Sequence, residues 1–451
     1  MSITRTGVAA LGLSVSAVAG AAVPAYDTYD LAARTNFSGA YNTLNSVFFN
    51  SATPSLSDSA GVACTTNGGF EGVWYDDGTT LGMGGAQLYI SDGFVTDVSL
   101  NESGQIVTEQ SASSNDGVVL VDQMGSMPAF GVNLLSGYGS PQISDTGRIG
   151  FKGRTGGGDA FFGSDLIGQG LSPAIHVAEV GIDSGSPYSF LFTPSMNDSD
   201  QIAGKARRGA AGVFGESQPD EIRVWDVDGS SVLIVQDRDG DPMSPFDRFD
   251  NSVSLTDSGA VAFVARDADT GDRGVYFSDG TTTIEIATEA HPDVSDIEFF
   301  KPAANDAGLV AFRAFNSAGL RAVFLGDGTG LIQIATEHGL IETDLGTARI
   351  DQNVTSSPTF GGGPAINAAG DVAFLAGLTP PDNDQIEWGT GLFIARATAG
   401  GPDLNGDGNV DSADLAILLA AWGACAGCPA DFDGSGVVDS ADLAVLLAAW
   451  G

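Results

Sequence analysis

Short apolar runs separated by polar turn residues fill the chain from about residue 50 to residue 400. The clearest unit is an eight-residue phrase, which reads NDAGLVAF at 305–312 and NAAGDVAF at 367–374. The Asn, Asp and Gly residues of its first half favour a turn, because Asx side chains bond to the nearby backbone and Gly tolerates a positive φ. The Val-Ala-Phe half is apolar and bounded by turns, as expected for a buried strand. Each phrase therefore predicts a turn that leads into a core strand.

A second hairpin signal usually follows the phrase. Asp-Gly stands between apolar runs at 274–281 (GVYFSDGT), 321–329 and 72–79, and this dipeptide favours tight β-hairpins. Further apolar runs follow the first two of these turns, at 283–287 and 331–335. One repeat unit therefore supplies three or four short strands.

The phrase occurs seven times at a mean spacing of about 52 residues, with its fourth position at residues 60, 104, 147, 200, 259, 308 and 370. This period, with three or four strands per unit, is typical of propeller blades. We therefore predict a mainly β fold, a propeller of about seven blades over residues 26–398. An open β-solenoid or a sandwich array is the alternative. Cys64 takes the Phe position of the most degenerate copy, which predicts a buried free thiol.

The phrase resembles the NxxGxxAF tandem repeats of exported bacterial proteins, which carry assorted C-terminal anchors. The resemblance covers most of the middle of the chain and is nearly silent on function. The N-terminus agrees with export, because Arg5 precedes an apolar run at 8–23 that ends in small residues. We expect residues 1–25 to be a signal peptide, with no integral membrane segment after its cleavage. The expected location is secreted or at the cell surface.

The last 49 residues contain a 21-residue unit written twice, DLNGDGNVDSADLAILLAAWG from Asp403 and DFDGSGVVDSADLAVLLAAWG from Asp431. Sixteen of the 21 positions are identical. In each copy an apolar stripe follows the acidic part at helical spacing, and each stripe ends in Trp422 or Trp450. We expect a separate domain at 399–451, in which two short helices bury these stripes against each other.

Oxygen side chains open each copy at positions 1, 3, 5, 9 and 12, the spacing of a calcium loop, with Gly408 or Gly436 at position 6 for the sharp turn. A backbone carbonyl at position 7 adds a further oxygen. Two calcium ions are the predicted cofactors, and crowded carboxylates make folding of the segment metal-dependent. The predicted ligands are Asp403, Asn405, Asp407, Asn409, Asp411 and Asp414 in the first loop, and Asp431, Asp433, Ser435, Val437, Asp439 and Asp442 in the second.

Two loop-and-helix repeats without an entering helix resemble a dockerin domain. The resemblance covers about 50 residues and implies calcium-dependent binding to a cohesin-like scaffold or cell-surface protein. The recognition positions of that family are loop positions 10 and 11, which are Ser412 and Ala413 in one copy and Ser440 and Ala441 in the other. The linker departs from the usual dockerin pattern, because it contains two cysteines, and the partner of such a variant need not be an ordinary cohesin.

Cys425 and Cys428 are these two cysteines. In an oxidising compartment they are expected to form a small disulfide ring between the loops. A zinc site is the weaker interpretation, because two thiolates without a nearby His supply half of a ligand set. A redox-active pair normally opens a helix in a βαβ unit, and no such unit is predicted here.

The composition of the chain limits the classes of partner that it can bind. The chain has 18 basic and 57 acidic residues and a net charge of −39, which excludes nucleic acid and anionic membrane surfaces because both require a basic footprint. None of His176, His291 and His338 has a spaced His partner, so a histidine metal centre is not expected. No phosphate-binding or nucleophile-elbow motif occurs in a sequence context that would support it.

These observations favour an exported, non-catalytic binding or structural protein, tethered by a calcium-dependent tail. A polysaccharide or a protein is the expected ligand of the repeat domain. The alternative is a carbohydrate-active enzyme of polysaccharide catabolism, a glycoside hydrolase or lyase, which needs two facing carboxylates. Sequence alone does not select such a pair among 57 acids.

Overall fold

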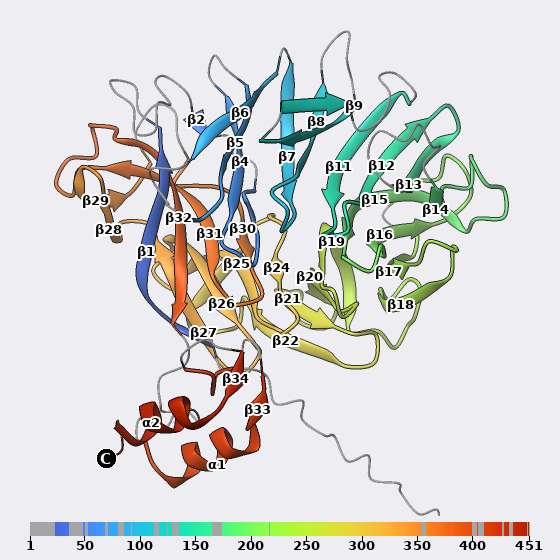
Figure 1. Ribbon diagram of the computed structural model, residues 1–451. Coiled ribbons are helices and arrows are strands. Elements are labelled where there is room, and N and C mark those ends of the chain that lie inside the picture. The colour runs from blue at the N-terminus through green and yellow to red at the C-terminus, as the bar shows by residue number, and fades with distance from the viewer. Residues whose placement is uncertain are drawn as a thin grey trace, which may run out of the picture.

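A computed structural model describes most of the chain (Figure 1). The described residues are 23–35, 48–49, 53–67, 71–79, 85–91, 93–111, 117–123, 125–128, 135–164, 174–215, 217–352, 358–398, 404, 410–425, 428–432, 436–448 and 450. Residues 1–22 of the predicted signal peptide lie outside them.

Seven antiparallel sheets follow one another in chain order and form the seven blades of a β-propeller, from the blue strands to the orange strands of Figure 1. The first three blades use β2 (Phe48–Phe49), β3 (Ser55–Leu56), β4 (Val62–Asn67), β5 (Gly72–Asp76) and β6 (Ala86–Ile90); β7 (Phe94–Leu100), β8 (Ile106–Ser111), β9 (Gly117–Asp122) and β10 (Gly125–Pro128); and β11 (Gly137–Ile143), β12 (Ile149–Thr155), β13 (Gly158–Ser164) and β14 (Ala174–Ala178).

The next three blades are equally regular. They use β15 (Tyr188–Met196), β16 (Ile202–Arg208), β17 (Asp220–Trp225) and β18 (Ser231–Gln236); β19 (Phe246–Leu255), β20 (Val261–Asp267), β21 (Arg273–Ser278) and β22 (Thr283–Thr288); and β23 (Val294–Ile297), β24 (Ala303–Ala304), β25 (Val310–Asn316), β26 (Arg321–Gly326) and β27 (Leu331–Thr336).

The seventh blade closes the ring with a strand from the other end of the domain. It uses β28 (Leu340–Thr343), β29 (Gly346–Ile350), β30 (Phe360–Ile366), β31 (Val372–Thr379), β32 (Gly389–Thr398) and, on its outer edge, β1 (Ala25–Arg34). β1 pairs antiparallel with β32, beside which it lies in Figure 1. Arg34 fixes the end of β1, because its guanidinium donates to both carboxylate oxygens of Asp344 at 2.7 and 2.8 Å.

The repeat phrase forms the turn between the innermost strand and the second strand of each blade, as predicted. Its fourth position has φ between 63° and 88° in all seven copies. Five of these residues are Gly, such as Gly308, while Ala60 and Asp200 adopt the same left-handed conformation with a side chain attached. The conformation therefore belongs to the repeat itself, even where the favoured residue has been lost.

The apolar half of each phrase fills the core between neighbouring blades. Phe312 and Phe374 are 1 and 2% exposed. Cys64, in the equivalent position, is buried and free, as predicted, and packs with Val62 and Trp74. The expected mainly β, seven-bladed propeller is thus confirmed.

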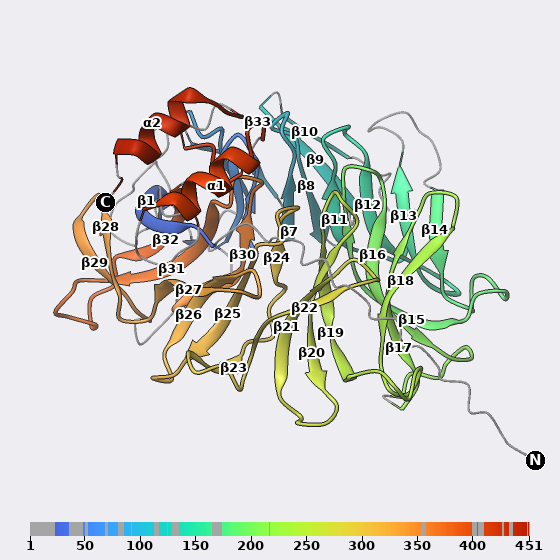
Figure 2. The ribbon, with the colours of Figure 1, turned by 90° about the horizontal axis from the view of Figure 1, so that it is seen from below.

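Two nine-residue helices, α1 (Ser412–Ala420) and α2 (Ser440–Ala448), and the short strands β33 (Gly423–Ala424) and β34 (Val437–Val438) form a small module next to the propeller (Figures 1 and 2). We expected the apolar stripes of the two helices to bury each other, and the structure shows this for only part of each stripe. Leu418 and Leu446 are fully buried, but Trp422 and Trp450 are 48 and 44% exposed. Helices of this length bury one narrow face, which here packs on Val438 and the loop residues rather than along the whole stripe.

No helix among the described residues has the length and apolar character needed to cross a lipid bilayer.

Candidate functional site

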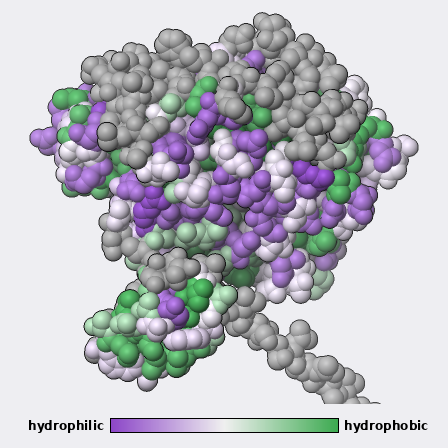
Figure 3. Space-filling model, in the orientation of Figure 1, coloured by the Kyte–Doolittle hydropathy of each residue, from purple (hydrophilic) through white to green (hydrophobic). Residues whose placement is uncertain are grey.

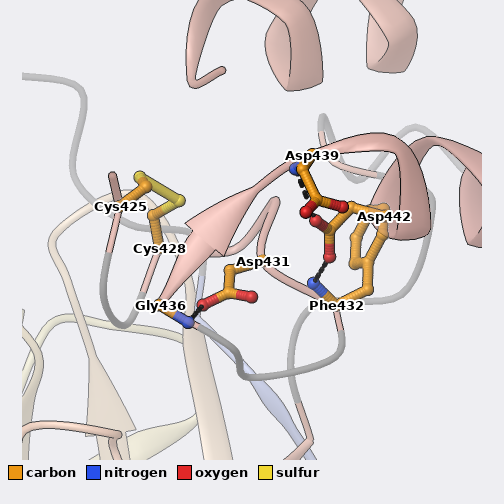
Figure 4. The surroundings of a disulfide bond; sticks show 7 residues. All are labelled: Cys425, Cys428, Asp431, Phe432, Gly436, Asp439 and Asp442. Atoms are coloured by element: carbon orange, nitrogen blue, oxygen red, sulfur yellow. Dashed lines mark hydrogen bonds between the residues drawn. A yellow bond between two sulfur atoms is a disulfide. The ribbon is translucent and has the colours of Figure 1, made fainter. Parts of the chain in front are cut away.

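In the loop before α2, carboxylates accept hydrogen bonds from backbone N–H groups of the same loop (Figure 4). Asp442 is fully buried, and its Oδ1 and Oδ2 accept the N–H groups of Phe432 at 2.6 Å and Asp439 at 2.8 Å. Asp431 is 4% exposed, and its Oδ2 accepts the N–H of Gly436 at 2.7 Å.

The loop before α1 repeats this geometry. Asp414 is fully buried, and its two oxygens accept the N–H groups of Leu404 at 2.7 Å and Asp411 at 2.8 Å. Asp411 caps α1 by accepting the N–H of Ala413 at 2.8 Å. Asp439 caps α2 in the same way, through Ala441. The remaining side-chain and carbonyl positions of the predicted ligand sets, Asp403, Asn405, Asp407, Asn409, Asp433 and Ser435, lie outside the described residues, whereas Val437 is the first residue of β34.

These two loops carry negative charge without any basic residue nearby in the sequence. Residues 401–451 contain eight aspartates and no Lys, Arg or His. Taking a carboxylate out of water is costly unless a cation or strong donors compensate. Two fully buried carboxylates in a segment without a basic residue form a set of hard oxygen donors of the kind that Ca²⁺ prefers.

A disulfide and a short hairpin join the two loops. Cys425 and Cys428 are bonded, with Cα atoms 5.6 Å apart (Figure 4). The N–H of Cys425 donates to the carbonyl of Gly436 at 3.0 Å, and β33 pairs antiparallel with β34. The linker is therefore attached to the middle of the second loop.

The outer surface of the module is apolar and duplicated. Exposed side chains recur in pairs 28 residues apart: Ile417 and Val445, Leu419 and Leu447, Trp422 and Trp450. Figure 3 shows hydrophobic residues over much of the visible face of this module. The four predicted recognition residues, Ser412, Ala413, Ser440 and Ala441, are also exposed, in the first turns of the two helices.

The propeller offers a second region, a central cavity of about 500 Å³ lined by the innermost strands of all seven blades. Hydrogen bonds between neighbouring blades hold its wall. The hydroxyls of Ser55, Ser99, Ser195 and Ser254, each at the same position of the repeat, accept an N–H from the inner strand of the next blade at 3.0–3.3 Å. The cavity is therefore bordered by hydroxyl-bearing strands held in register.

A ring of acids surrounds the turns of the phrase, and sequence reasoning missed it. Glu102, Asp145 and Asp198 donate their N–H groups to the carboxylates of Asp145, Asp198 and Asp257, each in the next blade, at 2.8, 2.6 and 2.8 Å. The N–H of Ala368 donates likewise to Asp58 at 2.6 Å. Burial, followed by the neighbouring charges of Asp257 and Asp145, raises the pKa of Asp198 to about 6. The repeating acid at the second position of the phrase is the signal that the turn interpretation overlooked.

A charged cleft of about 660 Å³ opens beside the central cavity between the fourth, fifth and sixth blades. Lys205 lies at its base, 4% exposed, and contacts Asp220 at 3.1 Å; burial lowers the pKa of this lysine. Asp237 is 2% exposed and accepts the N–H groups of Asp220 and Gly240. Burial raises the pKa of Asp237 to about 6, but its oxygens face the backbone, which gives it a structural role.

One further group of potential ligands occurs among the described residues, Glu337, His338 and Asp351, whose ligand atoms lie within 4.8 Å of one another. Its carboxylates already have protein partners. Asp351 pairs with Arg349, and Glu337 accepts the N–H of Arg321 at 3.1 Å. We therefore assign this group to the packing of the last two blades.

Comparisons with known proteins add a family. No curated protein matches the chain. Among solved structures, TolB from Acinetobacter baumannii is 13% identical with a TM-score of 0.41, and the alignment covers 64% of this chain but only 62% of TolB. The β-propeller domain of the Trilobed protease from Pyrococcus furiosus is 12% identical with a TM-score of 0.47, covering 77% of this chain and 92% of that domain.

A puromycin-hydrolyzing peptidase of Mycobacterium tuberculosis is 11% identical with a TM-score of 0.48, covering 79% of this chain and 54% of the peptidase. The model of a family of unknown function, DUF7453, matches residues 164–401, which is more than half of the chain. The chain therefore belongs to the DUF7453 family.

Proposed function

We propose that this protein is an exported, non-catalytic binding protein with a calcium-dependent C-terminal tether. In this proposal the propeller presents its cavity and loops to a ligand. The dockerin-like C-terminal module, loaded with two calcium ions, binds a cohesin-like scaffold or cell-surface protein. The observation that carries the proposal is the burial of Asp414 and Asp442 in a segment that contains no Lys, Arg or His.

A calcium ion in each loop would neutralise part of the negative charge of these carboxylates. Asp411 and Asp414 would hold the first ion, and Asp431, Asp439 and Asp442 the second, together with the loop positions outside the described residues. Calcium supplies no chemistry here beyond charge neutralisation and fixed loop geometry. The duplicated apolar surface around Trp422 and Trp450 supports a protein partner, since exposed apolar patches of this kind commonly mark interaction sites.

The non-catalytic assignment rests on the cleft. Asp237, whose pKa burial raises to about 6, is buried there and bonded to the backbone. The alternative, a glycoside hydrolase or lyase, predicts release of reducing ends or unsaturated products from soluble polysaccharides. The non-catalytic proposal predicts no release at any calcium concentration.

The tether is tested with the full chain immobilised in calcium and then in EDTA, and exposed to the envelope and secreted fractions of the source organism. The proposal predicts a protein partner that is retained in calcium and released by EDTA. A double variant, Asp414→Asn with Asp442→Asn, should fail to retain it. Asp382→Asn, an exposed acid outside the module, is the matched control. Retention that is equal in calcium and EDTA would contradict the proposal.

A further inference from the structure

Lysine occurs three times in the chain, and one of the three stands apart. The ammonium groups of Lys152 and Lys205 each lie 3.1 Å from a carboxylate oxygen, of Asp159 and Asp220 respectively. Among the described residues, no hydrogen bond or ion pair is made by the ammonium of Lys301. Asp97 is the carboxylate that acts on it electrostatically, but the two groups form no ion pair within bonding distance. In a chain with 57 acids, a lysine without a directly bonded carboxylate is a candidate for binding a ligand anion.

Lys301 lies where the central cavity and the charged cleft meet. It follows β23 in the sixth blade and lines both spaces, together with Phe299 and Phe300. Asp97, from β7 of the second blade, lines the central cavity as well. Asp97 is exposed at the cavity and Lys301 is half-buried, although protein atoms surround both groups closely. Burial lowers the pKa of Lys301 and raises that of Asp97, and the opposite charge of each partly offsets the effect on the other.

Phe299 adds an aromatic surface beside this lysine. It is 81% exposed, although it lines both the cavity and the cleft. The guanidinium of Arg273 lies 3.7 Å from the centre of its ring and is held by Asp250 at 2.5 Å. One face of the ring is therefore covered by a fixed cation, and much of the remaining ring surface is free to contact a ligand.

Basic residues gather at the same place. Four of the 18 basic residues, Lys205, Arg207, Arg248 and Lys301, line the cleft, and Arg273 adjoins it through Phe299. Three carboxylates line it as well, and Asp220 among them pairs with Lys205 and Arg207. Elsewhere the chain is strongly acidic, since its net charge is −39. An anionic ligand is therefore repelled by most of the surface and much less at this junction.

We propose that the junction of the central cavity and the cleft binds an acidic sugar unit of a polysaccharide. Lys301 takes the carboxylate of the sugar, Phe299 contacts the apolar face of its ring, and Asp97 with the serine hydroxyls of the cavity wall bonds to its hydroxyls. The hydroxyl-rich wall favours a polyhydroxylated ligand over an acidic peptide. This assignment rests on the proposed function, in which the propeller is the ligand-binding part of the protein.

The test uses the full chain in calcium, with its lysines reductively methylated with ¹³C. Three lysines give three side-chain signals, and loss of one signal in Lys301→Met identifies that residue. The probe is a hexamer of galacturonic acid. We expect it to shift the Lys301 signal and to leave the Lys152 signal unchanged. The methyl-esterified hexamer, which has the same rings without the charge, should bind at least about tenfold more weakly, the loss expected for one charge-assisted hydrogen bond.

Two variants separate the contacts. Lys301→Met should weaken binding of the acid hexamer about tenfold, whereas Lys301→Arg should retain most of it because the charge is kept. Phe299→Ala should weaken the binding of both hexamers, and because this side chain is exposed the variant is expected to fold normally.

Equal binding of the acid and ester hexamers would overturn the role of Lys301. Binding of polyglutamate without binding of the hexamer would overturn the assignment to a sugar. Absence of hexamer binding in a chain that still retains its tether partner in calcium would overturn this inference and leave the tether standing. Hexamer binding by a chain that has no calcium-dependent partner would overturn the tether and leave this inference standing.

Discussion

Asp198→Asn removes a charge from the ring of acids that joins the blades. The Asn side chain keeps an oxygen in position to accept the N–H of Asp145, which lies 2.6 Å from Asp198 Oδ1, so the bond between the blades is preserved. What is lost is a carboxylate whose pKa is raised to about 6 by burial and by the charges of Asp257 and Asp145. We expect the variant to be more stable than the wild type at neutral pH.

The magnitude follows from linkage. A carboxylate that binds protons more tightly in the folded state destabilises the fold when ionised, and this cost is relieved as the pH falls through about 6. The rise in the pKa of Asp198 to about 6 corresponds to about 3 kcal/mol, and partial exposure with salt screening reduces this cost to about 1 kcal/mol. The difference in unfolding free energy between Asp198→Asn and the wild type should therefore be about 1 kcal/mol at pH 7.5 and close to zero near pH 4.

Urea unfolding at several pH values, in constant excess calcium, measures this difference. Asp382→Asn, an exposed acid outside the ring, is the control and should leave the stability unchanged at every pH. A stabilisation by Asp198→Asn that does not depend on pH, or a loss of stability at pH 7.5, would refute the reasoning that the ring holds a strained charge.

Three other predictions use stability measurements. Ala60→Gly should raise the unfolding free energy by about 1 kcal/mol, because φ of Ala60 is 66°, whereas Gly308→Ala at the equivalent turn should lower it by a similar amount; opposite signs are the required result. Arg34→Ala should lower the unfolding free energy by about 3 kcal/mol by leaving Asp344 without its buried partner, and normal stability would show that this ion pair does not stabilise the closure of the ring. Leu446→Ala, at a fully buried position of the small C-terminal core, should cost that module about 3 kcal/mol and weaken calcium binding; unchanged calcium affinity would contradict the coupling of metal binding to folding.

The blades could be predicted from sequence because their signals are local. A turn residue such as Gly308 and a buried Phe312 lie four residues apart and recur at a regular period. The bonds that join the blades could not be predicted in the same way, because Asp145 and Asp198 are 53 residues apart and nothing local marks their contact. Their shared place in the repeat was the available signal.

In the C-terminal module, too, local features could be predicted from sequence and packing could not. The spacing of Asp431, Asp439 and Asp442 identified carboxylates that lie together in the second loop. The apolar spacing of the helices did not reveal that Trp422 would remain exposed, because periodicity gives a face of a helix but not what covers it. Lys301 carried no sequence signal at all, since its significance depends on its place between the cavity and the cleft.

The central claim is that the buried carboxylates of the C-terminal module are held by calcium. Titration calorimetry of the full, metal-free chain with calcium chloride tests it directly. The account predicts two calcium ions per chain, one fewer in Asp414→Asn and one fewer in Asp442→Asn, with no change in Asp382→Asn. Absence of calcium binding, or binding that survives both substitutions, would contradict it.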